Sequence, residues 1–88
     1  MNYKIAFKKS VSRDLKKIGK EAKRILNEIE FELSERAGIL PTLTGKFSGL
    51  RKFRVGRLRV IFTIIGDTAL ILRIGHRKEV YKSSITSW

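Results

Sequence analysis

The stretch Ile-Gly-His-Arg-Lys-Glu-Val-Tyr-Lys, residues 74–82, places an imidazole, a guanidinium, two amines and a phenol close together in the chain. An imidazole can carry a proton near neutral pH, and guanidinium and ammonium groups bind phosphate oxygens. The cluster therefore suits proton transfer, the binding of a polyanion, or simple solvation of a strand end. Taken one at a time, its side chains fit the last reading best, because strand ends are commonly basic and a tyrosine after a strand usually packs its ring.

A second basic set lies earlier in the chain. Lys52 and Arg54 are two positions apart, so on a strand both side chains project from one face. Arg59 joins that face if the apolar residues of its own strand pack on helices. Asp67 is the only carboxylate between residues 46 and 78, so an anionic ligand would relieve the repulsion among these cations. Taken together, these residues therefore indicate a functional site rather than solvated strand ends.

The pattern of the N-terminal half predicts one strand and two helices. Apolar residues alternate with other residues over about 2–8, as in a half-buried strand. Apolar residues then recur at helical spacing, which predicts a short helix capped by Ser10 or Ser12 and ended by Gly19. A second helix is expected from about residue 20 to Gly38, because its apolar positions recur every three or four residues.

The pattern of the C-terminal half predicts three consecutive strands. They are expected at residues 47–55, 58–65 and 68–75, with Gly56 and Gly66 in tight turns of an antiparallel meander. The order β-α-α-β-β-β predicts an α+β domain in which two N-terminal helices pack on a small antiparallel sheet. The first strand is expected at an edge of the meander, and periodicity leaves both edges open. A chain of 88 residues fits one domain spanning 1–88.

Composition narrows the classes of function. The chain has no cysteine and one histidine, which is poor material for a transition-metal centre, so we expect chemistry without a metal or cofactor. A formal charge of +12 favours nucleic acid or an acidic protein as partner. An anionic membrane surface is a third candidate, disfavoured because the strands need the helices to cover them. The chain shows neither a signal-peptide pattern nor an apolar run of ~18 residues, so the expected compartment is the cytoplasm.

Several sequence blocks, spread along nearly the whole chain, form a recognisable set. They are Phe7-Lys8-Lys9-Ser10, Asp14-Leu15-Lys16-Lys17, Leu43-Thr44-Gly45 and, most specifically, Leu50-Arg51-Lys52-Phe53-Arg54-Val55-Gly56-Arg57-Leu58-Arg59-Val60-Ile61-Phe62 and Ile74-Gly75-His76-Arg77-Lys78-Glu79-Val80-Tyr81. Together they resemble the RelE/ParE superfamily of toxins from bacterial and archaeal toxin–antitoxin systems, and its RelE side in particular. The resemblance implies a RelE-like fold and a ribosome-dependent endoribonuclease that cuts messenger RNA in the decoding site without a metal.

The resemblance also implies which residues carry the reaction. The residues that it makes catalytic are Lys52, Arg54, Arg59, Arg77 and Tyr81. The residues expected to contact RNA beside them are Arg51, Arg57, His76 and Lys78.

Cleavage without a metal uses the ribose 2′-hydroxyl as nucleophile, so these residues must move protons and stabilise charge on phosphorus. Lys52 is expected to accept the 2′ proton, because neighbouring cations favour its neutral form. Arg54 and Arg59 would hold phosphate oxygens. Arg77 would stabilise the leaving group and Tyr81 would stack on a base or orient the 2′-hydroxyl.

The expected partners are the ribosome, its messenger RNA and a RelB-like antitoxin that is acidic where it docks, in a heteromeric complex. Two other functions stay open. One is a ParE-like toxin that inhibits DNA gyrase without being an enzyme. The other is a nucleic-acid-binding module that does not cleave, for which strongly salt-dependent binding is expected.

Overall fold

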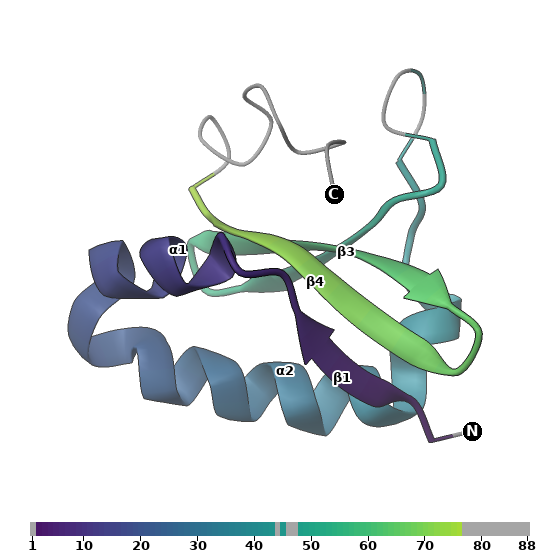
Figure 1. Cartoon of the computed structure of the whole chain (residues 1–88), viewed down its shortest axis with the longest axis horizontal. Coiled ribbons are helices and arrows are strands. Elements are labelled where there is room, and N and C mark those ends of the chain that lie inside the picture. Colours follow the sequence, from purple (N-terminus) through teal and green to yellow (C-terminus); the bar gives the residue numbers. More distant parts are fainter. Residues whose placement is uncertain (1, 44, 46–47, 77–88) are drawn as a thin grey trace.

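In the computed structural model, which describes residues 2–43, 45 and 48–76, the elements follow the predicted order β-α-α-β-β-β (Figure 1). They are β1 (Lys4–Phe7), α1 (Val11–Ile18), the 3₁₀ turn η1 (Gly19–Glu21), α2 (Ala22–Arg36), the 3₁₀ turn η2 (Ala37–Ile39), β2 (Arg51–Val55), β3 (Leu58–Ile65) and β4 (Thr68–Gly75). The predicted bounds of β3 and β4 are confirmed. The strand predicted from residue 47 begins at Arg51, and residues 46–47 lie outside the described part of the chain.

The start of α1 differs from the prediction. Ser10 occupies the N-cap position but its side chain makes no capping hydrogen bond, and the Ser12 hydroxyl donates to the Lys9 carbonyl at 2.9 Å instead. The predicted side-chain cap is therefore wrong. A serine caps from an extended backbone, whereas Ser10 has helical angles (φ −63°, ψ −18°). At the other end Gly19, with φ 74°, ends the helix as predicted.

The four strands form one sheet with the order β1-β4-β3-β2. Strands β2, β3 and β4 are the predicted antiparallel meander, but β1 pairs with β4 in parallel, so the sheet is mixed and the prediction of a purely antiparallel sheet is wrong in this respect. The reason lies in the helices. Helix α2 carries the chain back along β1, where the Tyr3 amide donates to the Ser34 carbonyl, so β2 starts out in the same direction as β1. Two hairpins later, β4 again has that direction.

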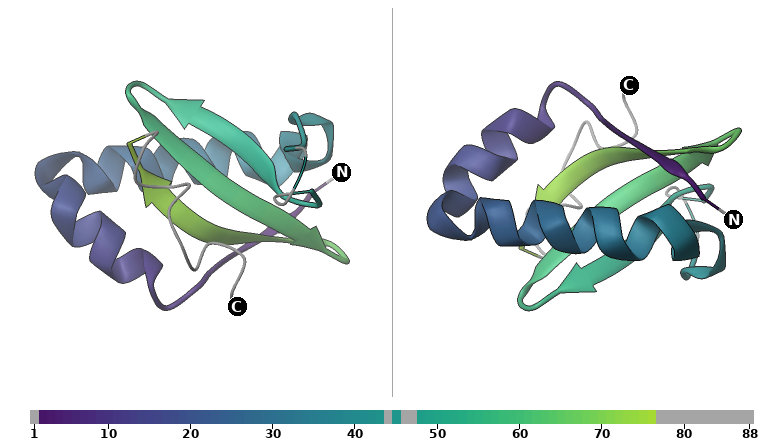
Figure 2. Two further views of the ribbon diagram at one scale, coloured as in Figure 1. Left: turned by 90° about the horizontal axis from the view of Figure 1, so that it is seen from above. Right: turned by 90° about the horizontal axis from the view of Figure 1, so that it is seen from below.

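Helix α2 crosses one side of the sheet and α1 lies beside the end of β4, as the view from below shows (Figure 2). The main core fills the space between these helices and the sheet. Helix α2 contributes a stripe at intervals of four residues, in which Ile25, Ile29 and Leu33 are fully buried. The sheet contributes the face that carries Val60 and Phe62, also fully buried. This face is called the helix face below.

The opposite side of the sheet, called the second face below, carries a smaller apolar cluster. Its buried members are Leu50, Ile61 and Leu72. None of the helices in the described ranges is long and apolar enough to cross a lipid bilayer.

One irregularity interrupts the pairing of β3 with β4. Ile61 lies opposite Arg73 and Phe62 lies opposite Ile71, so Leu72 is an extra residue, a β-bulge in β4. Strict alternation from Ile71, which belongs to the main core, would point Arg73 into that core as well. The bulge instead puts Arg73 opposite Ile61, on the second face.

Candidate nucleic-acid interface

Three of the predicted site residues come together on the second face. Arg54 and Arg59 are directly opposed across β2 and β3, and Lys52 is opposed to Ile61 of the apolar cluster on the same face. Phe53, between the two cations of β2, packs against the main core on the helix face. We call Lys52, Arg54 and Arg59 the cationic face. Its formation confirms the predicted alternation of side chains on β2 and β3.

The cationic face suits an anion that spans more than one side chain. Like charges directly opposed across two strands destabilise a sheet, and Arg54 and Arg59 occupy such positions. Arg54 is exposed, whereas Lys52 and Arg59 are half-buried, so their charges act from a surface that water screens incompletely. Guanidinium groups bind phosphate oxygens through two parallel hydrogen bonds. The arrangement can therefore hold the backbone of a nucleic acid.

A carboxylate of α1 fixes the end of β4 next to this face. The Oδ2 atom of Asp14 accepts hydrogen bonds from the Ile74 amide at 3.0 Å and from Arg73 Nε at 3.1 Å, and Oδ1 accepts one from Arg73 Nη2 at 3.3 Å. The last residue of β1 is Phe7, which pairs with Ile71, so β1 stops short of this point. Helix α1 lies beside the end of β4 (Figures 1 and 2). Beyond the last residue of β1, Asp14 therefore binds the free edge of β4 through the Ile74 amide.

Sequence analysis missed this bridge. Asp14 and Arg73 are 59 positions apart, and local patterns carry no information on such a pair. The one available signal is that Asp14 is the sole carboxylate in the basic stretch 8–20. It is also the one charged residue that is buried in the described part of the chain, at 6% exposure. A buried charge needs partners, and here they are Arg73 and the Ile74 amide.

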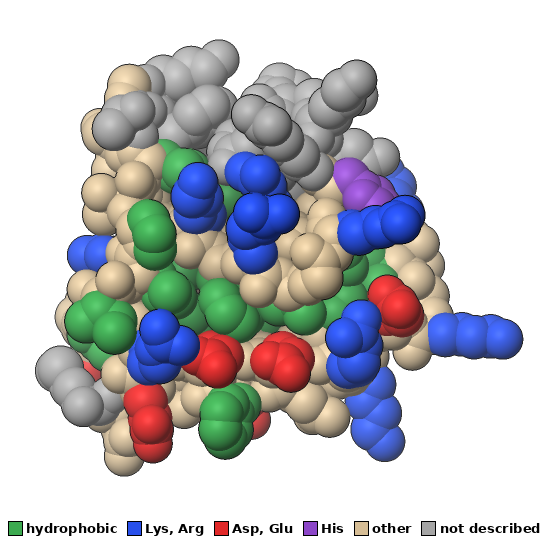
Figure 3. All heavy atoms as spheres, turned by 180° about the vertical axis from the view of Figure 1, so that it is seen from behind, with side chains coloured by type: hydrophobic (Ala, Val, Ile, Leu, Met, Phe, Trp, Pro, Cys, Tyr) green, Lys and Arg blue, Asp and Glu red, His purple; other side chains and the backbone are tan. Residues whose placement is uncertain are grey.

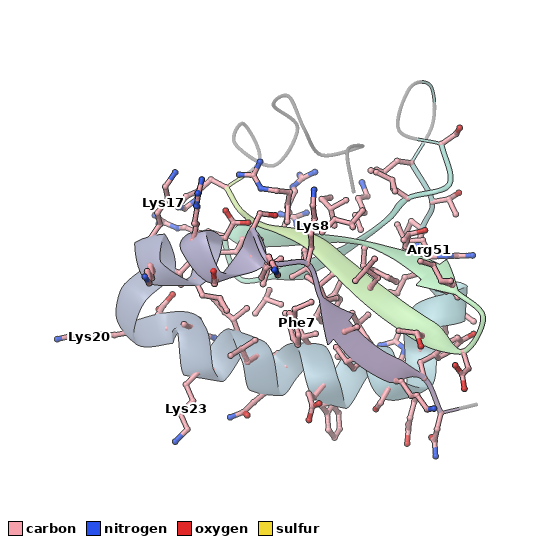
Figure 4. All side chains as sticks on the ribbon, viewed as in Figure 1. Phe7, Lys8, Lys17, Lys20, Lys23 and Arg51 are labelled. Carbon is pink, nitrogen blue, oxygen red and sulfur yellow. The ribbon has the colours of Figure 1, made fainter. Side chains whose placement is uncertain are left out.

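The remaining predicted site residues are distributed differently. Arg51 is directly opposed to Phe62 on the helix face, and its Nη1 donates to the Leu40 carbonyl at 2.7 Å. Figure 4 shows it at the far end of the molecule from α1. The structure therefore does not bring Arg51 to the cationic face. Arg57, in the turn between β2 and β3, and His76, after β4, are both exposed and line one pocket. Arg77, Lys78 and Tyr81 lie outside the described residues.

This pocket lies where α1, η1 and the start of α2 meet the sheet, and we call it the corner pocket. Its volume is about 460 Å³. Its lining comprises Asp14, Lys17, Ile18, Glu21, Arg24, Gly56, Arg57, Leu58, Ile74, Gly75 and His76. Sequence analysis named Arg57 and His76 but did not foresee that Lys17 and Arg24 lie with them, because that depends on how α1 docks. Within the described ranges, no group of three or more acidic or histidine side chains is arranged to hold a metal ion.

Comparison with known proteins assigns the family. A family model described as the ParE toxin of the type II toxin–antitoxin system parDE matches residues 5–81. The chain belongs to this toxin family. It is thus a toxin of a type II toxin–antitoxin system and a member of the RelE/ParE superfamily, which confirms the resemblance found in the sequence. Among curated protein sequences, none matches the chain significantly.

Solved structures agree with the family and the fold of this toxin. The toxin–antitoxin complex RelBE2 from Mycobacterium tuberculosis contains a chain that is 27% identical, with a TM-score of 0.76 over 88% of this chain and 100% of that one. A mutant of the E. coli toxin RelE is 16% identical, with a TM-score of 0.72 over 99% of this chain and 93% of that one. The chromosomal ParDE system of P. aeruginosa gives 17% identity and a TM-score of 0.68 over 84% and 95%. The last two show the shared fold alone.

Proposed function

We propose that this toxin is a ribosome-dependent endoribonuclease that cleaves messenger RNA in the ribosomal A site, without a metal, and so inhibits translation. The observation that carries the proposal is the directly opposed pair Arg54 and Arg59 with Lys52 on the same face of the sheet. The end of β4, from which Arg77 and Tyr81 follow in sequence, adjoins this face because Arg59 is opposed to Gly75.

In the proposed reaction the 2′-oxygen attacks the adjacent phosphorus and the bond from phosphorus to the 5′-oxygen breaks. Lys52 acts as the general base that takes the proton of the 2′-hydroxyl. Arg54 and Arg59 hold the phosphate oxygens on which negative charge grows. Arg77 stabilises the departing 5′-oxygen, which takes a proton from solvent water and ends as a hydroxyl. Tyr81 orients the ribose. The products are a 2′,3′-cyclic phosphate and a 5′-hydroxyl.

The test uses purified ribosomes programmed with a messenger of known sequence. We expect cleavage by the unaltered toxin and a fall of roughly 10²–10³-fold in rate for Arg59→Ala or Arg77→Ala. Lys23→Ala is a matched control that removes one cation from α2, outside the proposed site. Unchanged cleavage by Arg59→Ala, Arg77→Ala and Tyr81→Phe together would reject the assignment of the site. A 5′-phosphate on the product would reject the mechanism.

A second function has support from the family model, which describes a ParE toxin. Toxins of that side bind and inhibit DNA gyrase without cleaving RNA, as the sequence resemblance implies. The two functions differ in a direct readout. Expression of an RNA-cleaving toxin stops the incorporation of labelled amino acids first, whereas expression of a gyrase inhibitor stops DNA synthesis first. Supercoiling by purified gyrase in the presence of the toxin completes the comparison.

We further propose that a cognate antitoxin neutralises this toxin in a heteromeric complex. Support comes from the similar chains of RelBE2 and ParDE and from the E. coli RelE mutant bound to a peptide of its antitoxin RelB. The formal charge of +12 favours an antitoxin that is acidic where it docks. Co-expression of the protein encoded by the adjacent small open reading frame should restore growth, and that protein should co-purify with the toxin. A neighbouring product that does neither is not the antitoxin.

A further inference from the structure

We propose that the corner pocket is a nucleotide-binding subsite that takes guanine, with the flat base on an aliphatic floor and the phosphate at a cationic rim. The subsite is distinct from the cationic face on β2 and β3. Whether it binds nucleotides does not depend on whether the cationic face cleaves RNA, so the two proposals can fail separately.

The size and floor of the pocket suit a base. A volume of about 460 Å³ lies within the ~300–1,000 Å³ typical of small-molecule sites. Three residues with aliphatic side chains, from three different elements, line it, namely Ile18 at the end of α1, Leu58 at the start of β3 and Ile74 near the end of β4. Leu58 and Ile74 are buried and belong to the main core, so this floor is held in place by packing.

The rim of the pocket is positive. Lys17 and Arg57 are exposed, and in the described part of the chain neither has an ion-pair partner. They come from two different elements, Lys17 from α1 and Arg57 from the turn between β2 and β3. In Figure 3, which views the molecule from behind, basic and acidic side chains meet at one end of a band of apolar side chains. A phosphate that enters between Lys17 and Arg57 gains charge-assisted hydrogen bonds from both.

Glu21 gives the pocket a hydrogen-bond acceptor and selects the base. The other carboxylate in the lining, Asp14, already accepts from Arg73 and the Ile74 amide. Glu21 is paired with Arg24 at 3.5 Å, but both side chains are about three-fifths exposed (63% and 59%), so a ligand displaces this pair at little cost. A carboxylate accepts two parallel hydrogen bonds, and guanine presents two adjacent donors, N1–H and the N2 amine, on its Watson–Crick edge.

The combination of acceptor, floor and cations favours a nucleotide over an acidic peptide. A peptide that brings carboxylates to Lys17 and Arg57 also brings them near Glu21, which repels them. A guanine nucleotide uses both signs of charge. The pocket also adjoins the cationic face, since Leu58 precedes Arg59 in the chain and Gly75 is opposed to Arg59 across the sheet. One RNA strand can therefore reach both places.

The experiment is a nuclear magnetic resonance titration of the full ¹⁵N-labelled chain with four probes: GMP, AMP, guanosine and inorganic phosphate. We expect GMP to shift the amides of η1, the turn between β2 and β3, and the end of β4, with an affinity about tenfold above that of AMP. Glu21→Gln should abolish the preference for GMP over AMP and keep the binding of both. Lys17→Ala and Arg57→Ala should weaken GMP and AMP alike.

Lys20→Ala and Lys23→Ala are the matched controls. Each removes one charge from the same helical region, and Figure 4 shows both side chains pointing away from the body of the molecule. They should leave GMP affinity within about twofold, as expected for screened exposed charges. An RNA tetranucleotide with one guanine, set against one without guanine, separates a base in a strand from a free nucleotide as the natural source.

Several outcomes would overturn the proposal. If inorganic phosphate reproduces the shifts with the same affinity as GMP, the pocket is an anion site with no role for the base. Equal affinities for GMP and AMP in the unaltered chain would remove the role of Glu21. Saturable shifts at the same amides with a short Glu- and Leu-rich peptide, in the absence of any with GMP, would assign the pocket to an acidic protein partner.

Discussion

Replacing Asp14 by Asn removes the charge of the α1–β4 bridge while keeping the size of the side chain. Removing one partner of a buried ion pair costs about 3–5 kcal/mol, because the other charge stays buried without compensation. Two features reduce the cost here. The Arg73 side chain is 18% exposed, and the Asn oxygen can still accept from the Ile74 amide. We therefore expect a loss of about 2–3 kcal/mol in the free energy of unfolding.

Urea unfolding followed by circular dichroism measures this loss, and thermal unfolding should show a midpoint lower by roughly 8–24 °C. Glu32→Gln is the matched control. The ion pair of Glu32 with Arg36 is shorter, 2.7 Å against 3.1 Å for Arg73 with Asp14, but it lies on the surface of α2. Exposed pairs four residues apart on a helix contribute about 0.3–0.5 kcal/mol. If burial governs the energy, the longer pair matters several times more.

Equal losses for Asp14→Asn and Glu32→Gln would refute this reasoning, as would a loss below about 1 kcal/mol for Asp14→Asn. A double variant, Asp14→Leu with Arg73→Met, separates the ion pair from the bond to the backbone. Replacing both charges by apolar side chains is often neutral, but here it leaves the Ile74 amide without its acceptor. A residual loss of about 1–3 kcal/mol is expected, and full stability in the double variant would show that the amide does not need Asp14.

Two further variants test packing on the helix side of the fold, and a third tests the charge of the cationic face. Gly38→Ala should destabilise the fold by about 1–3 kcal/mol in urea unfolding, because the new methyl group meets the Tyr3 hydroxyl; the loss should shrink in a Tyr3→Phe background, and an unchanged loss would exclude this clash as the cause. Leu33→Ala should cost about 2–5 kcal/mol, since Leu33 is fully buried between α2 and the sheet, and a loss under 1 kcal/mol would contradict its place in the core. Arg54→Ala should lower the slope of log affinity for RNA against log salt concentration by about 1, and an unchanged slope would mean that Arg54 contacts no phosphate.

Much of this fold follows from local patterns in the sequence. The bounds of β3 and β4 could be predicted because apolar alternation ends at Gly56 and Gly66, whose positive φ angles (58° and 62°) tight turns require. The cationic face followed from the same alternation, since the spacing of Lys52 and Arg54 determines their side of the strand. The direction of β1 did not follow, because it depends on how many times the helices cross the sheet before β2 begins.

The α1–β4 bridge shows why the rest of the site needed the structure. Simple alternation along β4 puts Arg73 on the same face as Ile71, inside the main core, where an arginine without a partner would be prohibitively costly. The bulge at Leu72 turns Arg73 to the second face, and Asp14 is close enough to bind it only because β1 ends at Phe7. Each of these features depends on the others, so no local pattern predicts them separately. The same bridge sets the direction of the chain into Gly75 and His76, and with it the shape of the corner pocket.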